Sequence, residues 1–302
     1  MSKTLKQVIN ITHSVSEILS IEKLSDNQIS DRWSEYESDG CSFISIDIFN
    51  NRLREFKCYL HRREQSNFTP IEWGEYSFSL LNSKNQTSNI RKIAHRIKPM
   101  PVKMAENYVI HLFESANATK YMHSFLELSK IIADITKSKR YPIIGGGFTI
   151  DKANNGIKEI KLYYSLMHFD SCYAEYCDNE NFVRELSTSK LINELNDSNF
   201  CNIYSKIKNI FLQYNVPLSI FGVNKDVTAD IQTNKFYYRD WKNRLVNPIA
   251  LIDDLHCILF NTHIEKKYVD TIREILKQGY RQGEICVCSD GTSFILKLCY
   301  EA

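Results

Sequence analysis

The sequence predicts an α+β fold in which an antiparallel sheet closes into a β-barrel and helices surround it. Four pairs of strand-like segments alternate with helical segments along the 302 residues, and each pair reads as a hairpin with antiparallel strands. Helices between hairpins cover the apolar face of such a sheet. If the sheet closes, its other face becomes a lumen lined by alternate residues. No linker interrupts this order, so one domain is expected over residues 1–302.

Helical segments are predicted where apolar residues recur with a period near 3.6. In the first segment, Leu5, Val8 and Ile9 begin a stripe that continues to Ile21. The same criterion gives helices at 4–24, 117–136, 179–195, 199–214 and 248–279, and a short basic helix at 88–97 that the prolines after it end. Two further segments, 76–81 and 108–113, are predicted to be single strands.

The first hairpin has the clearest pattern. Apolar and polar residues alternate through 43–49, and they alternate again through 53–59 after Asn50-Asn51-Arg52. A three-residue loop then pairs Asp47 with Glu55, Ser45 with Lys57, Phe43 with Tyr59 and Ile46 with Phe56. One face of this hairpin is apolar and the other carries charged and polar groups, so we expect the apolar face to be the buried one.

Three more hairpins are predicted, at 142–150 with 157–166, at 218–223 with 233–241, and at 284–288 with 293–300, the last turning at Asp290-Gly291. The run Gly145-Gly146-Gly147 lies in the first of these three. It lacks the following helix and the Lys-Ser/Thr of a phosphate-binding P-loop. We therefore expect these glycines to let the strand bend or to let the backbone approach a substrate.

A lysine stands two residues before a tyrosine in three of the predicted strands. The pairs are Lys57 with Tyr59, Lys161 with Tyr163, and Lys235 with Tyr237, and the last strand carries Lys297-Leu298-Cys299-Tyr300. Residues i and i+2 of a strand share a face, so each pair points away from the apolar residue between its members. These side chains then either face solvent, where such pairs are common, or line a polar cavity inside a closed sheet.

Composition limits the function classes. The net charge of +2 argues against a nucleic-acid-binding protein, and 43% hydrophobic with 25% charged residues is typical of a globular chain. The nine cysteines are odd in number and scattered, which favours reduced thiols and a cytoplasmic location. Cys286-Val287-Cys288 lacks the spacing of a zinc site, so no metal-binding residues are predicted. Neither a signal peptide nor a membrane span is expected.

Two stretches carry a resemblance to a known family. Asp39-Gly40-Cys41-Ser42 precedes the first predicted strand, and Gly147-Phe148-Thr149-Ile150-Asp151 leads through a polar loop into Ile160-Lys161-Leu162-Tyr163. With the expected barrel of repeated αββα units, these stretches resemble the aromatic (ABBA-type) prenyltransferases, nearest the cyanobactin (RiPP) peptide prenyltransferases. The resemblance covers the first hairpin and the region 120–166.

The resemblance implies a transferase that ionises an allylic diphosphate, usually dimethylallyl diphosphate, and moves the alkyl group to a nucleophilic peptide side chain. The leaving diphosphate needs cations in a water-poor site, and the candidates are Lys57, Lys161, Lys235, Arg239 and Lys297. The rings of Tyr59, Tyr163 and Tyr237 are candidates for shielding the cation, at about 0.5–2 kcal/mol each. Asp47 and Glu55 are the candidate catalytic bases.

The sequence departs from the family pattern at two places. A glutamate is usual on the first strand, where Phe43 stands, and a histidine and an arginine usually follow the second-hairpin lysine, where Tyr163 and Ser165 stand. Either Asp47 or Glu55 takes the role of the base, or the nucleophile differs, or both carboxylates only pair with the lysine across the hairpin.

Two alternative functions remain open from the sequence. Tyr163 is more similar to the small-aromatic prenyltransferases, so transfer to a phenol or an indole is the first alternative. A non-catalytic barrel that binds an amphiphilic ligand is the second. For the leading hypothesis the expected partners are an allylic diphosphate and a peptide or small aromatic acceptor, with Mg²⁺ bound beside the diphosphate because it would share the charge. A monomer without nucleic-acid or membrane partners is expected.

Overall fold

Over the residues that it describes, the computed structural model has ten antiparallel strands that form a closed barrel, in the order β1-β10-β9-β8-β7-β6-β5-β4-β3-β2. It describes residues 3–35, 40–62, 71–81, 90–97, 102–136, 143–151, 156–165, 198–214, 216, 218–239, 247–290 and 293–302. The strands are β1 (Gly40–Phe49), β2 (Arg52–Arg62), β3 (Ile71–Ser79), β4 (Ile90–Ile97), β5 (Ile143–Asp151), β6 (Gly156–Ser165), β7 (Leu218–Asp226), β8 (Gln232–Arg239), β9 (Arg281–Ser289) and β10 (Phe294–Glu301). Pairing of β1 with β10 closes the barrel.

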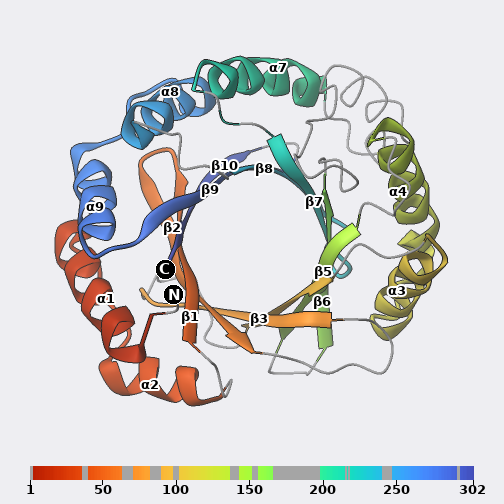
Figure 1. The fold of residues 1–302 in the computed structure, drawn as a ribbon, viewed down its shortest axis with the longest axis horizontal. Coiled ribbons are helices and arrows are strands. Elements are labelled where there is room, and N and C mark those ends of the chain that lie inside the picture. The colour runs from red at the N-terminus through yellow and green to blue at the C-terminus, as the bar shows by residue number, and fades with distance from the viewer. Residues whose placement is uncertain are drawn as a thin grey trace.

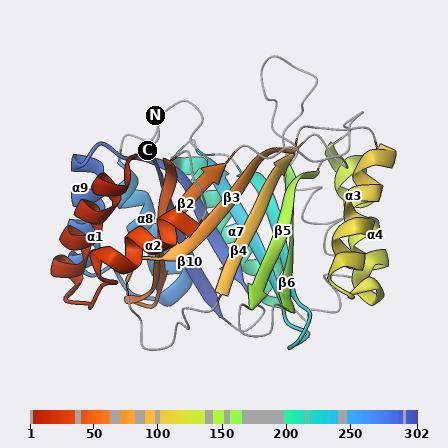
Figure 2. The same ribbon diagram turned by 90° about the horizontal axis from the view of Figure 1, so that it is seen from below.

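Helices form a ring around the outside of the barrel (Figure 1). They are α1 (Leu5–Leu19), α2 (Asp26–Glu35), α3 (Val102–Ser115), the 3-10 helix η1 (Thr119–Tyr121), α4 (Met122–Thr136), α7 (Ser198–Gln213), α8 (Pro248–Phe260) and α9 (Lys266–Lys277). In the side view of Figure 2 the strands run obliquely through the wall, as closure of a barrel requires. The predicted fold class, an antiparallel closed barrel surrounded by helices, is confirmed.

Alternation along β1 and β2 separates the outer face of the wall from the lumen. Ile46 and Phe56 lie opposite one another and are fully buried in the main apolar core. The neighbouring pairs are Ser45 with Lys57, Asp47 with Glu55, and Phe43 with Tyr59. This is the predicted register. A slip of one residue would turn the apolar set into the lumen and the charges into the core, so burial fixes the register.

The glycine run in β5 lets a helix approach the sheet. A Cβ atom on Gly146 would lie 2.7 Å from the hydroxyl oxygen of Tyr108 and 2.9 Å from Cδ1 of Leu112, both on α3. These distances are too short for a side chain at this position. Close packing of α3 is therefore the reason for glycine at Gly146, in place of the predicted strand bend or substrate approach.

Two predicted elements are wrong. Residues 88–97 were expected to form a helix, but residues 90–97 form β4, and the predicted strand 108–113 lies within α3. The isoleucines of β4 have helical spacing, yet pairing with β3 and β5 on both sides gives this segment its backbone hydrogen bonds. A short apolar run such as 108–113 reads equally well as a strand or a helix; in α3, Val109 and Phe113 share a buried face with Ala105.

The other predicted elements agree with the structure to within a few residues at most boundaries. All four predicted hairpins are present, as β1–β2, β5–β6, β7–β8 and β9–β10. The first helix ends earlier than expected because Ser20 takes a left-handed backbone (φ 54°), and α2, with only Ile29 buried, has no counterpart in the prediction. The predicted helix 179–195 lies outside the described residues. Among the described helices, none is both long and apolar enough to cross a membrane.

Candidate active site

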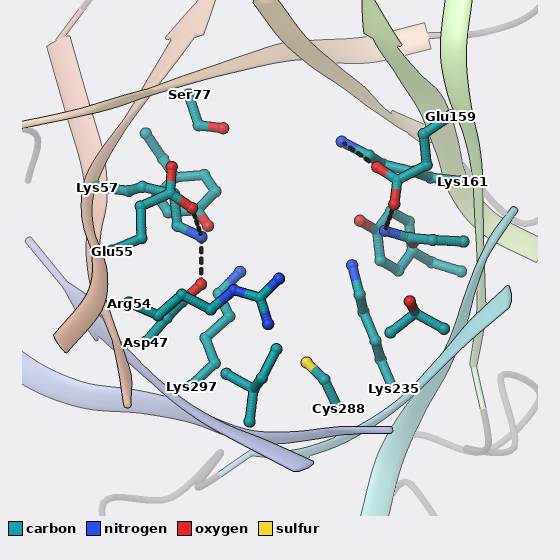
Figure 3. A pocket seen from close by; sticks show the side chains of 15 residues that line it. Asp47, Arg54, Glu55, Lys57, Ser77, Glu159, Lys161, Lys235, Cys288 and Lys297 are labelled. Carbon is teal, nitrogen blue, oxygen red and sulfur yellow. Dashed lines mark hydrogen bonds and ion pairs between the residues drawn. The ribbon is translucent and has the colours of Figure 1, made fainter. Parts of the chain in front are cut away.

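The lumen of the barrel contains a cavity of about 200 Å³ (Figure 3). Its described lining consists of Asp47, Arg54, Glu55, Lys57, Tyr59, Ser77, Glu159, Lys161, Tyr163, Asn224, Thr233, Lys235, Cys288, Ile295 and Lys297. Five of these side chains are cations and three are carboxylates. An excess of positive charge inside low-dielectric walls concentrates anions, so the lining suits an anionic ligand.

Four of the cations occupy equivalent places in the barrel. Lys57, Lys161, Lys235 and Lys297 lie on β2, β6, β8 and β10, each the second strand of a hairpin. Within the hairpins they stand opposite Ser45, Gly147, Gly222 and Cys286. Figure 3 shows their side chains pointing into the same space from different sides of the barrel. We call these four residues the lysine cluster.

Lys57 differs from the rest of the cluster because it is paired with two carboxylates. Its Nζ donates to Oδ2 of Asp47 and lies 2.8 Å from Oε2 of Glu55. Burial lowers the pKa of Lys57, but the two carboxylates outweigh it and raise the pKa well above its ordinary value. The candidate bases Asp47 and Glu55 therefore hold a lysine in place, as one alternative from the sequence expected.

Glu159 is held from three sides. It accepts hydrogen bonds from Thr149 (2.7 Å) and Asn224 (2.9 Å), and its carboxylate lies 3.8 Å from Nζ of Lys161. Burial raises the pKa of Glu159, but Lys161, Lys235 and these hydrogen bonds more than offset it and lower the pKa to about 2. Such a carboxylate is a weak base, and it fixes the position of Lys161.

Lys235 and Lys297 carry the charges that the site leaves uncompensated. Within the described residues, neither ammonium group forms an ion pair with a carboxylate. Nζ of Lys297 lies 4.8 Å from the ring centroid of Tyr59 and 6.0 Å from that of Tyr237. Burial lowers the pKa of Lys297, but Coulombic interaction with the titratable groups around it, Tyr59 first and Asp47 among them, outweighs burial and raises the pKa above its ordinary value.

Two of the three predicted tyrosines line the cavity. Tyr59 and Tyr163 are in the lining, and Tyr237 packs edge-on against Tyr163 with ring centroids 6.0 Å apart. A Cβ on Gly222 would lie 3.0 Å from Cδ1 of Tyr163 and 3.3 Å from Cε2 of Tyr237. Glycine at this position lets both rings lie against the backbone of β7, which gives the lumen an aromatic wall next to the lysine cluster.

Arg239 is the one predicted diphosphate ligand that does not line the cavity. Its guanidinium lies 3.4 Å from Oε1 of Glu284 and 2.6 Å from Oε1 of Glu301. The geometry thus places it in an ion-pair network with two carboxylates and not with the lysine cluster.

Sequence reasoning missed several lining residues. Glu159 stands two residues before Lys161, as Glu55 stands before Lys57, so the repeated Glu-x-Lys pattern was a usable signal. No sequence signal pointed to Arg54 as a lining residue, because simple alternation puts this residue on the apolar face of the hairpin. In the structure Asp47 pairs with Glu55 and Ile48 with Leu53, so Arg54 is the extra residue of a β-bulge, which re-aims its side chain into the lumen. Cys288 and Thr233 lie on the lumen face of predicted strands, and Asn224 lies in β7 one residue beyond the predicted strand 218–223.

A helix-covered, closed antiparallel barrel with a polar lumen defines the ABBA-type aromatic prenyltransferase fold, and comparison with solved structures agrees. The NotF prenyltransferase structure matches with a TM-score of 0.50 and 11% identity, over 86% of this chain and 80% of that one. The AnaPT structure from Neosartorya fischeri matches with a TM-score of 0.53 and 11% identity, over 86% and 78%. No protein-family model matches the chain, and no curated protein matches its sequence.

At 11% identity these structures establish a shared fold. The predicted resemblance to the ABBA-type barrels is confirmed at that level. The narrower likeness to the cyanobactin enzymes stays a prediction.

Proposed function

We propose that the protein transfers a dimethylallyl or longer allylic group from its diphosphate to a nucleophilic side chain of a peptide. The observation that carries this proposal is the lysine cluster, four ammonium groups that converge from separate hairpins beside an aromatic wall. One of the structures that share the fold is that of the NotF prenyltransferase, which supports the same reaction class for this chain.

In this proposal the lysine cluster binds the diphosphate and stabilises it as a leaving group. The bond between the allylic carbon and the diphosphate oxygen breaks, and its electron pair leaves with the diphosphate. Lys235 and Lys297 supply charge that no described carboxylate neutralises. Tyr59 and Tyr163 present rings to the same space, where a ring face stabilises a nearby cation by about 0.5–2 kcal/mol.

The acceptor is proposed to sit at the rim of the lumen. A second hollow of about 320 Å³, lined by Phe49, Arg52, Leu53, Arg54 and Ser293, shares Arg54 with the lumen cavity. A hollow outside the lumen suits an acceptor too large to enter it, and this supports a peptide. The acceptor's proton passes to Asp47 or Glu55, because Glu159, with a pKa of about 2, is a weak base.

A magnesium ion bound with the diphosphate is a separate part of the proposal. Mg²⁺ prefers several oxygen ligands in octahedral geometry. Among the described lining carboxylates, Asp47 and Glu55 already bind Lys57, and Glu159 accepts hydrogen bonds from two neighbours. These side chains do not form a ready set of ligands, so no step is assigned to the ion. Equal transfer rates with Mg²⁺ and with EDTA would assign the charge compensation to the lysine cluster alone.

A mass-spectrometric transfer assay tests the reaction. The protein is incubated with dimethylallyl diphosphate and a panel of peptides, phenols and indoles, and alkylated products and released pyrophosphate are measured. Products on peptides support the proposal, whereas products on phenols or indoles alone select the small-aromatic alternative. If no allylic diphosphate from dimethylallyl to farnesyl is turned over, a non-catalytic ligand-binding barrel is the better description.

A matched pair of variants on one strand tests the site. Lys161 lies in the lumen, whereas Lys158, also on β6, is exposed and does not line the cavity. We expect Lys161→Ala to lower kcat/KM by about 100-fold or more, because a lost charge-assisted contact in a dry site costs about 3 kcal/mol. Lys158→Ala should react as the native protein does. Equal activity of the two variants would contradict the placement of the diphosphate.

A further inference from the structure

Three metal-binding side-chain types converge at the end of α8, on the outside of the barrel. Asp253 and Cys257 are one helical turn apart and share a side of the helix. The helix ends at Asn261, whose left-handed backbone (φ 55°) reverses the chain, and His263 returns toward both side chains. Nδ1 of His263 lies 2.9 Å from Oδ2 of Asp253 and 3.2 Å from Sγ of Cys257.

The contacts do not form a catalytic relay. In a Cys-His-Asp triad the histidine uses one ring nitrogen for the nucleophile and the other for the carboxylate. Here Asp253 and Cys257 both contact the same nitrogen of His263. A single ring nitrogen has one proton or one lone pair. The three ligand atoms lie within 4.8 Å of one another, and one cation placed between them would satisfy all three.

The cluster is held in place by its surroundings. Oδ1 of Asp253 accepts a hydrogen bond from the backbone N–H of Ile264 (2.9 Å), which leaves Oδ2 directed at His263. Nδ2 of Asn51, in the turn between β1 and β2, donates to the carbonyl oxygen of His263 (2.8 Å), and Oδ1 of Asn51 accepts from the N–H of Glu265 (2.8 Å). Second contacts of this kind orient ligands in known metal sites.

The neighbouring polar groups do not compete for the same position. His256 uses both ring nitrogens, Nδ1 with the carbonyl oxygen of Thr262 (2.6 Å) and Nε2 with the N–H of Asn51 (3.3 Å). Asp254 accepts a hydrogen bond from Tyr214 (2.7 Å). Among the described residues, the ligand set is thus one carboxylate oxygen, one sulfur and one imidazole nitrogen.

We propose that Asp253, Cys257 and His263 bind a zinc-class divalent transition metal ion. Sulfur with imidazole and carboxylate is the ligand chemistry that Zn²⁺ takes in tetrahedral sites. The His263 side chain is 81% exposed, so the fourth position faces solvent. On binding, the thiol proton of Cys257 leaves to solvent, and the carboxylate and thiolate together neutralise the ion.

A bound metal ion would connect segments of the chain that lie far apart in the sequence. The ion ties the end of α8 to the loop before α9, and Asn51 ties that loop to the turn between β1 and β2. The same hairpin carries Asp47 and Glu55 into the lumen. Binding is therefore expected to stabilise the barrel at this hairpin. Asp253, Cys257 and His263 are spaced by four and six residues, which matches no cysteine-pair pattern. The sequence analysis looked for such a pattern and therefore predicted no metal-binding residues.

Cobalt substitution tests the site. Co²⁺ titrated into the apo protein is expected to give the intense visible bands of a tetrahedral site and a sulfur-to-metal charge-transfer band, and Zn²⁺ should displace it. Cys257→Ser should remove the charge-transfer band, and His263→Ala should weaken Zn²⁺ affinity by about 10–100-fold or more. His123→Ala, which removes an exposed histidine on α4, is the matched control and should bind normally.

Two readouts separate this site from the lumen thiols and from folding defects. A Cys286→Ser/Cys288→Ser variant should keep the charge-transfer band, because those thiols lie inside the barrel. Zinc should raise the melting temperature of the native protein and of His123→Ala but not that of Cys257→Ser. No cobalt spectrum in the native protein, or the same spectrum in Cys257→Ser, would overturn the proposal.

Discussion

Replacing Lys235 by methionine tests whether the positive charge of this side chain serves ligand binding or the stability of the fold. Lys235 lines the cavity and forms no ion pair within the described residues, in contrast to Lys57. Methionine is similar in length and flexible enough to fill the vacated space. We expect the variant to fold normally and to lose affinity for the diphosphate.

The expected magnitudes follow from these contacts. Removing one preorganised donor to a developing anion costs about 2.7–4 kcal/mol, or roughly 10²–10³-fold in rate. Lys235 acts on the carboxylate of Glu159 only at long range, through its effect on the pKa. Its loss should therefore change the free energy of unfolding by less than about 1 kcal/mol, as for a weakly coupled pair.

The rate of transfer from dimethylallyl diphosphate measures the first quantity, isothermal titration calorimetry with inorganic pyrophosphate measures the loss of affinity, and urea unfolding measures the change in stability. Lys158→Met, which removes an exposed lysine of the same sheet outside the cavity lining, is the control. Unchanged pyrophosphate affinity in Lys235→Met would refute the reasoning. So would a loss of stability as large as the loss of binding, because Lys235 would then be a structural residue.

Two further predictions concern the stability that the ion pairs of Lys57 and the contacts of Glu159 contribute. Lys57→Met should lower the free energy of unfolding by about 3–5 kcal/mol, because it leaves Asp47 and Glu55 side by side in the lumen without the ammonium group of Lys57. Urea unfolding measures this, and adding Asp47→Asn should restore part of the loss; a double variant less stable than the single one would contradict the argument. Glu159 has a folded pKa of about 2, below its ordinary 4.5, so its contribution to stability is present above about pH 4.5 and is lost as the pH falls toward 2. The difference corresponds to about 3 kcal/mol, and Glu159→Gln should flatten the pH dependence of stability in that range. An acid-induced loss equal to that of the native protein would assign the effect to other carboxylates.

The alternation of apolar and polar residues was enough to predict the pairing of the first hairpin from Phe43–Tyr59 to Asp47–Glu55, but not its turn, because Phe49 pairs with Arg52 and the predicted three-residue loop is a two-residue turn followed by a bulge. Its register places Lys57 opposite Ser45 and Asp47 opposite Glu55, as expected, because a strand has a period of two and one of its faces is buried. The same reasoning failed at 88–97 and 108–113. There the local pattern fits two structures, and pairing with neighbouring strands or packing on the barrel decides between them.

The sequence by itself determined that a lysine and a tyrosine share one face in each of three strands, since this follows from spacing alone. Only the tertiary structure decided which lysines keep an uncompensated charge. Lys57 is neutralised across its own hairpin, Arg239 is paired with Glu301, and Lys235 and Lys297 face the cavity. A bulge brought in Arg54, and a helix end brought together Asp253 and His263. Charge balance and ligand geometry depend on distances between segments far apart in the chain, and folding sets those distances.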